Sequence, residues 1–171
     1  AAILKNKHKS VEDLLAVVHD LHARGLSTAE QTGLQGGSNG GLMVLAAMVD
    51  EPDSVGAVVA EVPLADMLRY PHLSSGASWL AEFGDPHSED EQRALYDLSP
   101  YHRIAHQRTY PATLLTTSLS DDRVHPAHAF KTYARLQQLE QASWLYCPED
   151  GGHTGNTTQE ELADETAVIM T

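Results

Sequence analysis

Ser38 stands at the centre of a G-x-S-x-G pattern, within the run Gly36-Gly37-Ser38-Asn39-Gly40-Gly41. This spacing suits a serine nucleophile on a sharp strand-to-helix turn, which presents the hydroxyl at the carboxyl edge of a sheet. We expect the glycines two residues to either side, Gly36 and Gly40, to remove Cβ atoms that would clash in this turn. The N–H of Asn39 is expected to face the position where an oxyanion would form.

An acid and a histidine follow Ser38 in an order that favours nucleophilic catalysis. A serine hydroxyl needs a histidine to take its proton and a carboxylate to fix the tautomer of that imidazole. Asp121 and His153 follow in the order Ser, Asp, His, which is the order of α/β-hydrolases. His153 lies in a glycine-rich loop, and Asp122 remains an alternative to Asp121 as the acid. A phosphate-binding turn is disfavoured because no lysine follows the glycines at Walker A spacing.

The other histidines give weaker signals. His102 and His106 are spaced like metal ligands on a helix, but no H-E-x-x-H pattern surrounds them. His125 and His128 flank Pro126 at a predicted helix start, where capping or surface roles are expected. We therefore predict no metal site.

Strands alternate with helices along the chain. Ser10 and Asp13 are interpreted as a capping box that begins a helix ending at Gly25. Buried strands are predicted at residues 32–35, 55–62, 112–117 and 144–147. Further helices are predicted at residues 42–49, 64–70, 89–96, 126–139 and 159–170, with Trp79 and Phe83 in a loop. This alternation predicts an α/β fold with a parallel sheet, whose strands end next to Ser38, Asp121 and His153.

Composition limits the class of protein. The chain of 171 residues, 42% of them hydrophobic, suits one domain over residues 1–171. Its formal net charge of −13 disfavours nucleic acid and anionic membranes as partners. Cys147 is the only cysteine, which excludes an internal disulfide. Without a signal-peptide pattern or a membrane-length apolar run, we expect a soluble, cytoplasmic protein.

Several consecutive motifs resemble the catalytic domain of the prolyl oligopeptidase family of serine peptidases. They are Gly36 to Leu42, Asp66-Met67-Leu68, Trp79, Phe83-Gly84, Ser99-Pro100, Tyr110-Pro111, Asp121 to Val124 and Gly151-Gly152-His153. The resemblance covers nearly the whole chain. It implies an α/β-hydrolase fold in which Ser38 is the nucleophile, Asp121 the orienting acid and His153 the general base. The Asn39 N–H would form one half of the oxyanion hole, and no cofactor is implied.

The resemblance also implies a substrate pocket. Trp79 resembles the indole that stacks on the substrate proline, with Phe83 and Val124 helping to line the pocket. Phe83 stands where a tyrosine is usual, and Arg123 resembles an arginine that binds a substrate carbonyl. As alternatives, Trp79 could serve only as a core residue, and Arg123 could pair only with the neighbouring aspartates.

The sequence departs from the family pattern ahead of residues 36–41, the strand-to-helix turn around Ser38 that is known as a nucleophile elbow. Full members carry a β-propeller and further strands there, and residues 1–37 are too few for either. The second oxyanion donor of the family, a tyrosine hydroxyl, comes from that part, and no tyrosine precedes Tyr70. We therefore expect a C-terminal portion of a longer peptidase, truncated at its N-terminal strands. Its open sheet edge could pair with a second copy.

The predicted function is hydrolysis of peptide bonds after proline through an acyl-enzyme, with a peptide as substrate. One alternative is an esterase or aminoacyl-peptidase that uses the same triad. The other is a catalytically incompetent fragment that forms a homo-oligomer through its exposed sheet edge.

Overall fold

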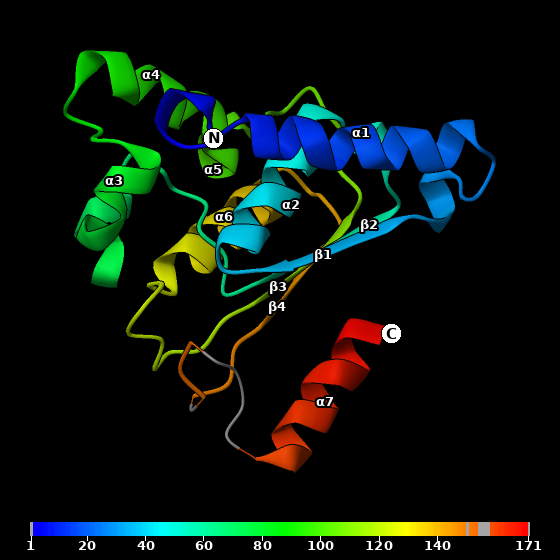
Figure 1. Ribbon diagram of the computed structural model, residues 1–171. Coiled ribbons are helices and arrows are strands. Elements are labelled where there is room, and N and C mark those ends of the chain that lie inside the picture. Colours follow the sequence, from blue (N-terminus) through cyan, green and yellow to red (C-terminus); the bar gives the residue numbers. More distant parts are fainter. Residues whose placement is uncertain (1, 150, 154–157, 171) are drawn as a thin grey trace.

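A parallel four-stranded sheet forms the centre of the protein. The computed structural model describes residues 2–149, 151–153 and 158–170. The strands are β1 (Gly33–Gly37), β2 (Ala57–Glu61), β3 (Ala112–Thr116) and β4 (Ser143–Tyr146), hydrogen-bonded in the order β1-β2-β3-β4 (Figure 1). All three pairings are parallel. The predicted α/β fold with a parallel sheet is confirmed, and each strand lies close to its predicted range.

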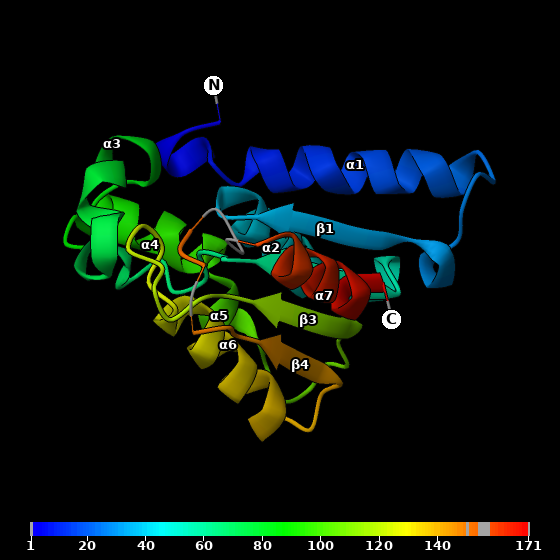
Figure 2. The ribbon, with the colours of Figure 1, turned by 90° about the horizontal axis from the view of Figure 1, so that it is seen from below.

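Helices connect the strands and cover the sheet unequally. The helices are α1 (Lys9–Ala23), α2 (Asn39–Asp50), α3 (Leu80–Phe83), α4 (Glu89–Leu98), α5 (Pro100–Arg103), α6 (Ala127–Gln138) and α7 (Gln159–Met170). Short 3-10 helices lie at Leu4–Asn6, Ala29–Gln31, Pro52–Ser54, Tyr70–His72 and Ser74–Trp79. Figures 1 and 2 show α2 and α6 on one face of the sheet, with α1 outside α2, and α7 on the other face. Among the described residues, no helix is both long enough and apolar enough to span a membrane.

The core is centred on the sheet, α2 and α1, and it extends to buried residues of α3, α4 and α6. Most of α2 is buried, and α1 contributes an apolar stripe of Val11, Leu15 and Val18. The predicted end of α1 at Gly25 is confirmed: Gly25 has φ +67°, its N–H donates to His22 O, and Leu26 N–H donates to Leu21 O. This pair of bonds is the Schellman arrangement, which favours glycine because of its left-handed backbone.

The predicted capping box at Ser10 is wrong. Helix α1 begins at Lys9, and no side chain caps it. The preceding 3-10 helix runs almost directly into α1, so the Ser10 N–H donates to Lys7 O and the Val11 N–H to His8 O. Backbone carbonyls therefore accept the hydrogen bonds that a capping side chain would otherwise provide.

The predicted helix at residues 64–70 is also wrong. Residues 64–66 are irregular and residues 67–69 form a turn. Side chains from distant elements accept hydrogen bonds from the backbone N–H groups of this stretch. Ala65 and Asp66 donate to His128 Nδ1, at 3.1 and 3.0 Å, and Met67 donates to Ser99 Oγ at 3.0 Å. These bonds replace the hydrogen bonds within a helix that the apolar pattern predicted.

Trp79 and Phe83 do not lie in an irregular loop, as predicted, but at the ends of short helices. Trp79 ends the 3-10 helix Ser74–Trp79, and Phe83 ends α3. Gly76 is required within the first of these helices because a Cβ there would lie 1.7 Å from Tyr70 O. Close packing of this kind fixes the direction of the segment.

Candidate active site

Ser38 occupies a strained backbone position between β1 and α2. Its φ of +55° and ψ of −116° are unfavourable for a residue with a side chain. A Cβ on Gly36 would lie 2.5 Å from Gly40 O, so this glycine is required as predicted. The prediction for Gly40 is wrong, because a Cβ there would meet nothing within 4 Å. It is Gly41 whose Cβ would clash, at 2.7 Å from Pro63 Cβ.

Backbone hydrogen bonds hold Ser38 against the end of β2. The Ser38 N–H donates to Glu61 O at 2.8 Å, and the Leu64 N–H donates to Ser38 O at 3.4 Å. Asn39 is the first residue of α2, so its N–H has no acceptor within the helix. This N–H lies at the positive end of the helix dipole, which suits a developing negative charge.

Asp121 and His153 lie side by side at the carboxyl ends of β3 and β4. His153 Nδ1 is 2.9 Å from Asp121 Oδ2, and the Asp121 side chain is 0% exposed. Asp121 Oδ1 accepts the N–H groups of Arg123 and Val124, at 3.0 and 2.9 Å. These bonds orient the carboxylate toward His153. Asp122, the alternative left open by the sequence, is exposed.

A glycine-rich turn after β4 carries His153. Gly151 and Gly152 have φ of +127° and +62°, which a residue with a side chain would adopt only with strain. With Nδ1 donating to the Asp121 carboxylate, His153 Nε2 is left as a proton acceptor. Within the described residues, no hydrogen bond joins His153 to Ser38 Oγ. Catalytic hydrogen bonds are often long before substrate binds.

The four predicted pocket residues differ in exposure. Arg123 is exposed, and Trp79 is half-buried against the core. Ser75, in the helix that ends at Trp79, donates its N–H to Arg123 O at 3.3 Å, which ties these two segments together. By contrast, Phe83 is 3% exposed and Val124 is 1% exposed, so both lie in the core. The Phe83 ring packs edge-on against Tyr70, with ring centres 5.6 Å apart.

Among the described residues, no group of three histidine, cysteine or acidic side chains is arranged to hold a metal ion. His125 is exposed and accepts the Ala127 N–H at the start of α6, as expected of a cap. The interpretation of His128 as a cap or surface residue is wrong, because it is 1% exposed. It faces the core because it begins the buried stripe of α6 that continues with Thr132 and Leu136.

Ser99 and His128 make polar contacts near this site that the sequence did not predict. Each binds the turn after β2, on which the backbone of Ser38 rests. The helical spacing of His128, Thr132 and Leu136 was a usable signal for His128. For Ser99, which joins α4 to α5, local sequence carries no such signal.

Comparison with known proteins agrees with this geometry. The model of the prolyl oligopeptidase family matches residues 1–170. An uncharacterised peptidase of Sinorhizobium fredii, y4nA, is 37% identical over 95% of this chain and 22% of its own length. The prolyl endopeptidase of Elizabethkingia meningoseptica is 33% identical over 97% of this chain and 24% of its own length. The chain thus spans about a quarter of the length of the curated relatives that it matches.

Solved structures give the same result. A structure from a study of two prolyl endopeptidases superposes with a TM-score of 0.91 at 34% identity, covering 99% of this chain and 25% of that one. Prolyl oligopeptidase B from Galerina marginata, bound to a 35-residue substrate, superposes with a TM-score of 0.88 at 29% identity, covering 96% and 24%. The sheet with its flanking helices is therefore the α/β-hydrolase fold of prolyl oligopeptidase catalytic domains. With its family match and its similarity to these enzymes, the chain belongs to the prolyl oligopeptidase family of serine peptidases.

Proposed function

We propose that this chain forms the catalytic portion of a serine peptidase that cleaves after proline through Ser38, Asp121 and His153. The observation that carries the proposal is the hydrogen bond between His153 Nδ1 and the buried Asp121 carboxylate. That pair lies at the carboxyl ends of the parallel strands, the same end of the sheet at which Ser38 occupies its strained turn. Cleavage after proline is supported by the family match and by relatives named prolyl endopeptidase.

The reaction proceeds through an acyl-enzyme. His153 Nε2 takes the Ser38 hydroxyl proton while Oγ attacks the scissile carbonyl carbon, and Asp121 stabilises the imidazolium that results. The Asn39 N–H donates to the oxyanion of the tetrahedral intermediate. His153 then gives its proton to the leaving amine, and the peptide C–N bond breaks. A water molecule, activated in the same way, hydrolyses the acyl ester and restores the Ser38 hydroxyl.

Substrate would bind beside Trp79 and Arg123. The Trp79 ring is half-buried, so one part of it can pack on a proline ring while another contacts the core. The exposed Arg123 guanidinium, which makes no ion pair with the described residues, is free to donate to a substrate carbonyl. Phe83 and Val124 belong to the core cluster on which Trp79 packs, so they would support this surface from below.

A fluorophosphonate probe tests the proposed nucleophile directly, because it reacts with an activated serine. We expect the full chain to be labelled at Ser38, and Ser38→Ala to abolish labelling. A well-folded sample that is not labelled would refute catalysis by this chain. Preference for proline-containing peptides over aryl esters supports the peptidase, and the reverse preference supports the esterase or aminoacyl-peptidase alternative.

A second candidate function is self-association of a catalytically incompetent chain. Within the described residues β1 has a partner strand on one side only, and Gly33, Gln35 and Gly37 are exposed along it. Unpaired strand edges of this kind can pair with another chain. This candidate is supported if the chain does not react with the fluorophosphonate probe, sediments as a dimer, and becomes monomeric in Gln35→Pro. A monomer that reacts with the probe would exclude it.

A further inference from the structure

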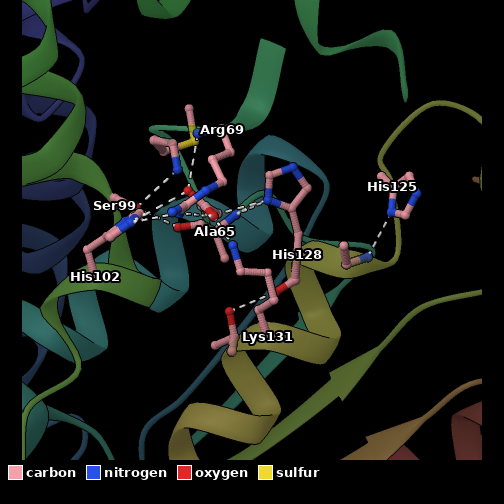
Figure 3. A network of polar contacts seen from close by, with 11 residues as sticks. Ala65, Arg69, Ser99, His102, His125, His128 and Lys131 are labelled. Carbon is pink, nitrogen blue, oxygen red and sulfur yellow. Dashed lines mark hydrogen bonds and ion pairs between the residues drawn. The ribbon is translucent and has the colours of Figure 1, made fainter. Parts of the chain in front are cut away.

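A second group of serine, histidine and aspartate side chains lies at the turn that follows β2. Ser99 Oγ is 2.8 Å from His102 Nδ1, and His102 Nε2 is 3.7 Å from Asp66 Oδ1 (Figure 3). Ser99 is nevertheless unsuited to nucleophilic attack. It is 0% exposed, its hydroxyl donates to Ala65 O at 2.8 Å, and its oxygen accepts the Met67 N–H. These two hydrogen bonds are made to the backbone of residues 62–67, which we call the support segment.

His128 binds the same support segment from α6. Its Nδ1 lies within 3.1 Å of the N–H groups of both Ala65 and Asp66, so this nitrogen must be an unprotonated acceptor. The proton of the neutral ring is therefore on Nε2, which is buried and has no partner among the described residues. Burial lowers the pKa of His128 to about 4, which keeps the ring neutral near pH 7.

The support segment in turn holds Ser38. Leu64 donates its N–H to Ser38 O at 3.4 Å, and Glu61, which directly precedes the segment, accepts the Ser38 N–H at 2.8 Å. Pro63 packs so closely against Gly41 that no Cβ fits between them. A displacement of the support segment must therefore move the serine.

Helix α6 also connects this segment with the acid of the candidate triad. The helix starts at Ala127, immediately after the loop in which Asp121 accepts the N–H of Val124. One turn beyond His128, Lys131 forms an ion pair with Asp66 of the support segment. His128 and Lys131, both on α6, thus bind the support segment (Figure 3), and the backbone of that segment binds Ser38.

We propose that His128 is a positioning residue, whose Nδ1 acceptor fixes the support segment and thereby the place of Ser38 relative to Asp121 and His153. The inference rests on the proposed function for its catalytic consequence, but the anchoring contact exists independently of it. His128 does not touch the reacting atoms. Its effect is on the geometry of the nucleophile, where a misplacement of about 1 Å can lower a rate about a hundredfold.

Variants of His128 in the full chain test the role of the acceptor. His128→Leu keeps an apolar side chain of similar reach without the acceptor, and we expect the rate of fluorophosphonate labelling at Ser38 to fall about tenfold to a hundredfold. His128→Asn places Oδ1 near the position of Nδ1 and should restore the rate to within about threefold of the unmodified chain. Thr132→Val is the matched control, because Thr132 is equally buried on α6 and its hydroxyl donates to the backbone carbonyl of His128 within that helix, not to the support segment.

A folded His128→Leu variant that is labelled at the unmodified rate would overturn the proposal. Equal slowing in His128→Leu and His128→Asn would also overturn it, because the acceptor would then not matter. If His128→Leu does not fold, Ser99→Ala, which removes the other anchor, and His128→Asn decide the question in the same assay. A ring nitrogen spectrum of the unmodified chain that shows the proton on Nδ1 overturns the proposal in every case.

Amide hydrogen exchange separates this inference from the proposed function. In His128→Leu, the amides of Ala65, Asp66 and Ser38 should exchange faster than in Thr132→Val. If the unmodified chain is not labelled, the proposed function fails, while faster exchange at Ser38 still supports the anchor. Unchanged exchange at Ser38 in the folded variant overturns the anchor even where labelling is seen.

Discussion

Alanine substitution at two adjacent glycines of the elbow, Gly40 and Gly41, should change folding stability very differently. Both lie in the first turn of α2, where replacing glycine by alanine stabilises a helix by up to about 1 kcal/mol. A Cβ on Gly40 would meet nothing within 4 Å. A Cβ on Gly41 would lie 2.7 Å from Pro63 Cβ and 2.9 Å from Pro63 Cα. The two variants therefore share the gain in helix propensity and differ in the close contacts that a Cβ on Gly41 alone would make.

The size of the difference follows from that clash. Carbon atoms in ordinary contact lie about 3.5–4.0 Å apart, so Gly41→Ala requires α2 and the support segment to separate by about 1 Å. Pro63 cannot relieve the contact by rotating, because its ring is rigid and its Cα belongs to the backbone. Overpacking of this kind costs about 1–3 kcal/mol. We expect Gly41→Ala to be less stable than Gly40→Ala by this amount.

Urea unfolding of the two variants measures this difference as a shift in midpoint at a constant m value. Because the separation also displaces Ser38, the rate of fluorophosphonate labelling should fall by up to about a hundredfold in Gly41→Ala. Equal midpoints, or a more stable Gly41→Ala, would refute the close contact between the elbow and Pro63 on which the support segment depends.

Three further predictions concern pH, the acid and the core. The pKa of His128 is about 4 in the folded chain, against an ordinary value of 6.5. As pH falls, the unfolded chain therefore protonates His128 before the folded chain does, and folding stability is lost between about pH 6.5 and about pH 4. The loss should reach about 3 kcal/mol and disappear from the pH profile of His128→Asn; identical profiles would contradict it. Asp121→Asn should slow the labelling of Ser38 about a thousandfold or more while Asp122→Asn leaves it unchanged, and the opposite result would make Asp122 the acid. Phe83→Ala should lower the free energy of unfolding by about 3–5 kcal/mol in denaturant titrations, because Phe83 is 3% exposed; a loss below 1 kcal/mol would place its ring outside the core.

Much of the fold could be predicted because buried parallel strands and amphipathic helices leave strong local patterns. The valine-rich run that forms β2 and the apolar run that forms α2 are recognisable without any knowledge of their partners. The end of α1 was equally local, since one glycine with its following residues makes the terminating bonds. Elements whose stability is decided within a few residues are the ones that sequence reasoning finds.

The wrong prediction of a helix at residues 64–70 concerns residues whose partners are distant in sequence. The helix predicted at residues 64–70 does not form because His128 and Ser99 accept its amide protons from two other elements. No local pattern contains those contacts. The sequence favours Asp121 as the acid but leaves Asp122 as an alternative, because the contacts in which the two differ are also distant. Asp121 is buried and bonded to His153, whereas Asp122 is exposed.

The strained position of Ser38 depends on these same distant contacts. A non-glycine residue in a sparsely populated backbone region costs about 1–3 kcal/mol, and it persists only where the surroundings over-determine it. Here both backbone groups of Ser38 are bonded to Glu61 and Leu64, at the end of β2 and in the support segment. That segment is fixed by side chains from α6 and from the junction of α4 with α5. Substitutions at His128 or Ser99 should therefore alter the chemistry of Ser38 without touching a substrate, because they remove the constraints that make its strain sustainable.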